Sequence, residues 1–213
     1  MEMVEGILGK KLGMTRIFDE EGNVVPVTVV EAGPCIIVQK KTVEKDGYQG
    51  IQMGFLPKKK TRVTKPLLGH FEKAQVSCFY YLKEFKVENI DAVEVGQEIT
   101  VDEFQPGDIV NVTGKSKGRG FAGVIKRYGF KRGPETHGSR NHRGPKSIGA
   151  CAFPGRVIKG KKMPGHMGNR QVTIKNLKVI DVRPEHNLLL VKGAIPGSRN
   201  SLVIIKKVVE EIR

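Results

Sequence analysis

Positive charge is concentrated in one continuous part of this sequence. Residues 111–170 contain 15 Lys and Arg and a single acid, Glu135, whereas the rest of the chain contains 22 bases and 21 acids. The same stretch holds 13 of the 26 glycines. Like charges at this density repel one another, and too few apolar residues are present to offset the repulsion. The sequence therefore predicts a nearly neutral folded part that carries a basic, glycine-rich insertion.

The overall composition predicts a polyanionic partner and an intracellular location. The net charge of +15 favours nucleic acid or an acidic membrane surface as the partner. Residues 1–14 lack the apolar core of a signal peptide, and no stretch approaches the roughly 18 to 20 apolar residues of a membrane span. Cys35, Cys78 and Cys151 form no Cys-x-x-Cys pair, so we expect reduced thiols in the cytoplasm, with Cys35 and Cys78 buried.

The nearly neutral part is predicted to be mainly β, as an antiparallel barrel. Short β-branched or alternating runs are separated by turn signals such as Gly33-Pro34 and 105–108. The predicted strands are 24–30, 35–39, 50–55, 98–101, 108–112, 171–182, 187–191 and 201–208. Strands on both sides of the basic stretch must pair, so that stretch is inserted into the barrel. We expect five parts: 1–65, the first part of the barrel; 66–97, a small α/β insertion with a helix at 67–74; 98–130, barrel continuation and a short helix at 121–128; 131–165, an extended basic loop; and 166–213, the last part of the barrel.

The basic insertion opens with a segment, 114–120, in which glycines alternate with cations. Gly118 and Gly120 would let the backbone approach a phosphate closely or adopt a positive φ angle. The segment is not a Walker loop, because the upstream glycine is replaced by Ile109. Residues 131–164 show neither helix nor strand periodicity and should become ordered only on a partner. As an extended hairpin they could reach on the order of 50 Å.

Metal binding and catalysis are disfavoured in this insertion. His137, His142, His166 and Cys151 match no zinc spacing, and histidines in such a loop are more often RNA contacts. No paired carboxylates or nucleophile–base set is present, which argues against an RNA-modifying enzyme. A DNA architectural protein would more usually carry apolar wedges or a groove-reading helix. We therefore predict a non-enzymatic RNA-binding protein without a cofactor, metal or small-molecule substrate.

Several motifs are typical of one known family. The first comprises Phe104, Asn111, Gly114, Ser116, Gly118, Arg119, Gly120, Gly123 and Arg127. Further motifs lie at 6–15, 159–163, 165–168 and 187–197. On these residues, which span nearly the whole chain, the sequence closely resembles the bacterial form of the universal large-subunit ribosomal protein three family.

The resemblance implies a barrel like the second domain of translation factors, with an extended loop. It also implies direct binding to large-subunit rRNA, a role early in subunit assembly, contacts with neighbouring ribosomal proteins, and a loop directed towards the peptidyl transferase centre. One departure concerns a glutamine that is methylated in some relatives: Ala150 stands at that position here and cannot be modified in this way.

The residues predicted to bind RNA are the bases, histidines and two glycines of the insertion, together with two lysines of the opening motif. They are Lys10, Lys11, Lys115, Lys117, Gly118, Arg119, Gly120, Lys126, Arg127, Lys131, Arg132, His137, Arg140, His142, Arg143, Lys146, Arg156, Lys159, Lys161, Lys162, His166 and Arg170.

Overall fold

The computed structural model describes residues 4, 6–87 and 89–208, so the outermost ends of the first and last predicted parts lie outside the described residues. The chain divides into two compact units. We call residues 1–115 with 171–213 the core unit, and residues 116–170 the basic unit.

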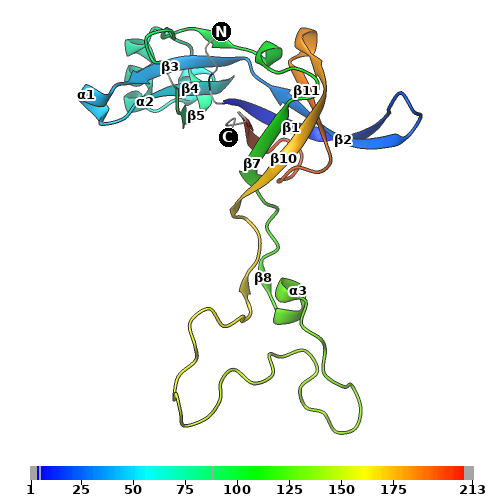
Figure 1. Cartoon of the computed structure of the whole chain (residues 1–213). Coiled ribbons are helices and arrows are strands. Elements are labelled where there is room, and N and C mark those ends of the chain that lie inside the picture. The colour runs from blue at the N-terminus through cyan, green and yellow to red at the C-terminus, as the bar shows by residue number, and fades with distance from the viewer. Residues whose placement is uncertain (1–3, 5, 88, 209–213) are drawn as a thin grey trace, which may run out of the picture. The chain divides into compact units, whose positions relative to one another are not determined.

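Six strands of the core unit close into an antiparallel barrel, which confirms the predicted fold class (Figure 1). Around the barrel they follow the order β1 (Gly6–Phe18), β12 (Leu202–Lys207), β7 (Ile109–Lys115), β10 (Gln171–Arg183), β11 (Leu188–Lys192) and β2 (Val24–Ala32). β12 shows why these residues form barrel strands. Val203 and Ile205 are buried, whereas Leu202, Ile204 and Lys206 beside them are partly exposed, as the alternation of side chains along a strand requires.

Four further strands of the core unit form a separate sheet, in the order β5 (Phe79–Phe85), β4 (Gly50–Pro57), β3 (Cys35–Lys41) and β6 (Glu98–Ile99). The prediction that all of 1–65 and 98–130 continues the barrel is therefore wrong for β3, β4 and β6. The physical reason lies in β3. Cys35 and Ile37 belong to the main core, whereas Ile36 and Val38 pack with Phe71 of α2 (Lys65–Lys73) in a second cluster. Burial on both faces produces an uninterrupted apolar run, which resembles a barrel strand in the sequence.

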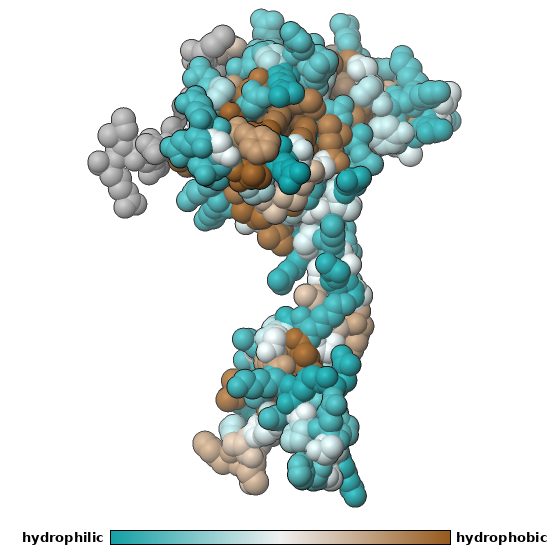
Figure 2. All heavy atoms as spheres, turned by 90° about the vertical axis from the view of Figure 1, so that its right-hand side faces the viewer, coloured by the Kyte–Doolittle hydropathy of each residue, from teal (hydrophilic) through white to brown (hydrophobic). Residues whose placement is uncertain are grey.

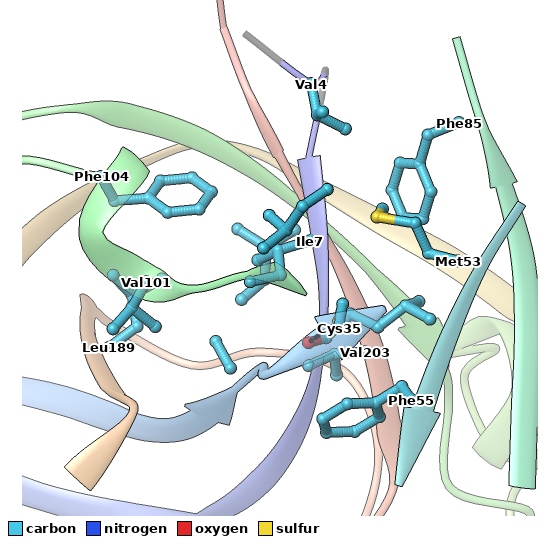
Figure 3. Close-up of a cluster of buried hydrophobic side chains, with 14 of the residues drawn as sticks. Val4, Ile7, Cys35, Met53, Phe55, Phe85, Val101, Phe104, Leu189 and Val203 are labelled. Atoms are coloured by element: carbon cyan, nitrogen blue, oxygen red, sulfur yellow. Dashed lines mark hydrogen bonds between the residues drawn. The ribbon is translucent and has the colours of Figure 1, made fainter. Parts of the chain in front are cut away.

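The barrel and the second sheet share one hydrophobic core. In Figure 3, Ile7, Leu189 and Val203 from the barrel converge with Cys35 and Phe55 from the second sheet. Cys78 is buried in the smaller cluster under α2, so the predicted burial of Cys35 and Cys78 is confirmed. Burial in this apolar core raises the pKa of the Cys35 thiol to about 12, so it stays protonated at neutral pH.

The remaining elements are short. In the core unit these are α1 (Val43–Asp46) and the 3-10 turns Lys60–Arg62, Val101–Glu103 and Pro184–His186. The helix predicted at 67–74 corresponds to α2. The helix predicted at 121–128 begins only at Val124, as α3 (Val124–Tyr128), because Phe121–Ala122 forms strand β8 and pairs with β9 (Gly165–His166). That partner lies more than 40 residues away in the sequence, so local periodicity could not predict the pairing.

Lys11 has a structural role inside the core unit. Its side chain is buried, and its Nζ donates hydrogen bonds to the carbonyl oxygens of Ile195 at 2.8 Å and Gly197 at 3.2 Å. The Lys11 backbone also bonds to Asn200 and Ser201. A buried ammonium requires such acceptors, so Lys11 ties β1 to the 195–201 loop and is not available to a phosphate in this structure.

We expect the core unit to fold without the basic unit. Lys115 and Gln171 are cross-strand partners, so an Asn-Gly dipeptide in place of residues 116–170 would close β7 and β10 as a two-residue hairpin. Of the buried apolar side chains among the described residues, only Ala122 and Val124 would be lost. The shorter connection also lowers the entropy cost of loop closure. The variant should melt at or above the wild-type temperature when unfolding is followed by circular dichroism. An unfolded variant would show that the two units are not separable.

Candidate nucleic-acid interface

The basic unit carries a charge that it cannot neutralise by itself. It contains 14 Lys and Arg, and its only acid is Glu135, which pairs with Arg132. Figure 2 shows that the visible face of this unit is mostly hydrophilic, with only scattered hydrophobic side chains. Every cation of the unit is exposed except Arg127, which is partly buried. The unit therefore presents a dense array of cations to an anionic partner.

Backbone pairing joins the two chain ends of the basic unit. The backbone N–H of Ser116 donates to the Arg170 carbonyl at 2.9 Å. The N–H of Arg119 donates to the Met167 carbonyl, and that of Met167 donates to the Gly120 carbonyl, both at 2.9 Å. β8 and β9 extend this ladder. The two ends of the unit are therefore held together by hydrogen bonds, with hardly any buried apolar surface.

Three glycines in this ladder differ in what the fold requires of them. Gly120 adopts a φ angle of +65°, as predicted. Gly168 has φ +74°, and a Cβ there would lie 2.0 Å from the Lys117 carbonyl oxygen. Gly118 has no such constraint, because a Cβ would meet only the Cβ of Asn169 at 3.5 Å. Sequence reasoning selected Gly118 and Gly120 but missed Gly168, since glycine density alone does not reveal which backbone position is crowded.

Side-chain contacts connect α3 to Lys162 and Met163, which precede β9. The Arg127 guanidinium donates to the Met163 carbonyl at 2.7 Å and lies 5.0 Å from the centre of the Tyr128 ring. The Lys162 ammonium lies 5.7 Å from the same ring. Arg127 is therefore partly used within the protein, whereas Lys126 on the same helix is free to face a partner as an exposed side chain.

The outer part of the unit, 131–164, consists of turns and irregular backbone among the described residues, in line with its lack of periodicity. A closed turn forms where Gly133 donates to the His142 carbonyl at 3.0 Å and the His142 ring bonds to the Pro134 carbonyl at 2.9 Å. His142 thus supports the turn, and His137 adopts a φ of +57°; both side chains are exposed.

Most of the predicted site residues are exposed. The exposed ones in the basic unit are Lys117, Gly118, Arg119, Gly120, Lys126, Lys131, Arg132, His137, Arg140, His142, Arg143, Lys146, Arg156, Lys159, Lys161, Lys162, His166 and Arg170. Three predicted residues belong to the core unit instead. Lys115 is exposed at the end of β7, Lys10 is half-buried with its Nζ 3.7 Å from Glu31, and Lys11 is buried.

Sequence reasoning also passed over two aromatic residues of the basic unit. Phe121 is 80% exposed and Phe153 is 90% exposed. Both are apolar rings in a segment otherwise rich in charge, and that contrast is the signal that could have identified them.

Other kinds of site have little support in the described residues. No three His, Cys, Asp or Glu side chains there gather closely enough to hold a metal ion. None of the described helices is long and apolar enough to cross a membrane.

Comparison with known proteins gives a consistent result along the chain. Residues 82–186 match the family model described as ribosomal protein L3. The chain is 59% identical over 208 residues to the protein named "Large ribosomal subunit protein uL3" of Carboxydothermus hydrogenoformans, covering 98% of this chain and 99% of that protein. Proteins with the same name from Syntrophotalea carbinolica and Pelotomaculum thermopropionicum are each 57% identical, across 96% of this chain and 98% and 97% of their own lengths. Identity of this extent over nearly full length leaves one conclusion: the chain belongs to the ribosomal protein L3 family.

Proposed function

We propose that this chain is a structural, non-enzymatic protein of the large ribosomal subunit that binds rRNA directly through its basic unit. The relatives with which it shares more than half of its residues are named large-subunit proteins. The observation that carries the RNA-binding proposal is the basic unit itself, with 14 exposed or partly exposed cations and only one acid.

RNA is the partner whose chemistry fits this unit best. Folded RNA brings phosphates close together, and cations inserted between them allow helices to pack that would otherwise repel one another. The basic unit offers some of those cations on a ladder of paired backbone and the others on α3 and the irregular segment 131–164. Gly118 leaves the backbone of the ladder open for close approach. Such an arrangement suits a segment that fills spaces within folded RNA.

The finer parts of the proposal rest on the family resemblance. They are a role in initiating subunit assembly, contacts with neighbouring large-subunit proteins, and an extension of the basic unit towards the peptidyl transferase centre. The basic unit supplies no catalytic group for peptide transfer in this proposal. It acts by holding the RNA around that centre in place.

Binding to fragments of large-subunit rRNA should depend strongly on salt. Each neutralised phosphate contributes about −0.7 to −0.9 to the slope of log K against log salt. The double variant Lys117→Ala/Arg119→Ala should make the slope shallower by about 1.4 to 1.8. Lys45→Ala removes an exposed base from α1 of the core unit and should leave the slope unchanged. A wild-type slope no steeper than about −2 in filter-binding titrations would contradict the electrostatic account.

Gly118→Ala should weaken RNA binding more than Lys115→Ala does. The added methyl group has room within the protein, so the free chain should keep its melting temperature. It would nevertheless block a phosphate that approaches the backbone, whereas Lys115 is one charge among many. Gly69→Ala, in α2, where a Cβ would meet nothing within 4 Å, is the matched control and should leave RNA affinity unchanged. Equal RNA affinities for wild type and Gly118→Ala would show that Gly118 only serves a flexible turn.

Large subunits reconstituted with the variant that carries Asn-Gly in place of 116–170 should assemble incompletely or form peptide bonds slowly. The variant keeps the core unit but lacks the cations proposed to hold the rRNA. Sucrose-gradient sedimentation and a single-turnover peptide-bond assay measure the two effects, with Lys45→Ala as the control. Complete subunits with wild-type peptide-bond rates would rule out the proposed role of the basic unit.

A further inference from the structure

Phe121 occupies an outward position on the most regular part of the basic unit. The neighbouring side chains Ala122 and Val124 are the two buried apolar side chains of this unit among the described residues. Strand alternation therefore turns Ala122 inwards and Phe121 outwards. A single exposed apolar residue is common in proteins and needs no explanation by itself. Phe121 is informative because hydrogen bonds hold the backbone around it and because His166 lies opposite it.

The backbone around Phe121 is well anchored. The preceding Gly120 accepts a hydrogen bond from Met167 at 2.9 Å, and Arg119 donates to the Met167 carbonyl at 2.9 Å. Within β8 and β9, Phe121 is the direct cross-strand partner of His166. Directly opposed residues of an antiparallel pair project their side chains from the same face, with Cβ atoms about 5 Å apart. The ladder therefore projects a phenyl and an imidazole ring from the same face, both exposed.

Neither ring is in contact with another ring in the described part of the chain, since the ring–ring contacts there involve other residues. Tyr128 provides the contrast, because Arg127 and Lys162 occupy positions next to its ring. Phe153 is more exposed than Phe121, but it lies outside the paired strands and has no cross-strand ring opposite to it. Phe121 and His166 thus form the one pair of exposed rings held on a strand ladder of the described basic unit.

We infer that Phe121 and His166 form a platform on which unpaired bases of RNA stack. This inference rests on the proposed RNA-binding function and adds a second kind of contact to it. Nucleobases are flat, have an apolar face and are joined to the phosphates that the surrounding cations attract, so they complement both features of this surface. A base that is already paired within a helix cannot reach the platform. The ligand is therefore a loop, bulge or single-stranded segment of RNA.

Stacking can be separated from phosphate binding by its salt dependence. Loss of one stacked base weakens binding by about 5- to 150-fold, but it removes no ionic contact. Phe121→Leu should therefore bind a single-stranded RNA oligonucleotide about 5- to 150-fold more weakly with an unchanged salt slope. Phe121→Trp should bind like wild type, because it keeps a ring. Lys126→Ala should show the opposite pattern, with a shallower slope.

The experiment uses the full chain and a single-stranded RNA that contains 2-aminopurine, with a duplex of the same length for comparison. Wild type should quench the 2-aminopurine fluorescence of the single strand, and Phe121→Leu and His166→Ala should lose that quenching. Ile158→Ala, which removes another exposed apolar side chain of the same unit, is the matched control and should behave like wild type. Duplex binding should be the same for Phe121→Leu and wild type.

The outcomes distinguish this inference from the proposed function. If wild type binds neither RNA, the proposed function itself fails. If wild type binds with a steep salt slope while Phe121→Leu retains affinity and quenching, only the stacking platform is overturned. A photo-crosslinking amino acid at position 121 provides a second measurement in reconstituted large subunits. Crosslinks to rRNA are expected there, and crosslinks to a protein alone would assign this surface to a protein partner and overturn the inference.

Discussion

The repulsion among the cations of the basic unit is the constraint on which the rest of this protein depends. Fourteen positive charges with one acid cannot be buried together without a large desolvation cost. A segment with this composition has no hydrophobic core to offset the conformational entropy lost on folding. In its described part only Ala122 and Val124 are buried apolar residues. The core unit therefore contains nearly all of the buried apolar surface. It fixes both ends of the segment by pairing β7 with β10.

Because the buried apolar surface lies in the core unit, the backbone of the basic unit is held in place by hydrogen bonds and by glycines that allow close packing. The ladder formed by 116–122 and 165–170 brings two backbones so close that Gly168 has no room for a side chain. Arg127 adds one side-chain bond to the Met163 carbonyl. These contacts shape the two ends of the unit without covering its cations. The result is a segment whose charges stay exposed, as a role in binding phosphates requires.

The sequence predicted those features that depend on local pattern, and it failed where distant residues decide the outcome. Strand alternation and turn signals located five of the six barrel strands but missed β1, and the charge count located the basic unit. The membership of β3 in a second sheet could not be predicted, because its apolar run is the same whether the strand closes a barrel or is covered by α2. Lys11 was assigned to RNA binding because of its charge, but its buried ammonium donates to acceptors 184 and 186 residues further along the chain. The different constraints on Gly118 and Gly168 likewise depend on residues about 50 positions away.

The pairing of Phe121 with His166 adds a property that cations alone do not supply. Lysine and arginine bind the phosphates of any RNA, and their attraction weakens as salt screens it. A ring face contributes an interaction that salt hardly affects, and it accepts only a base that is free to leave its helix. In the proposed function, cations that hold the backbone and rings that accept an unpaired base together select for the folded shape of an RNA. A structural protein needs that selectivity, because it must bind one site among many similar phosphates.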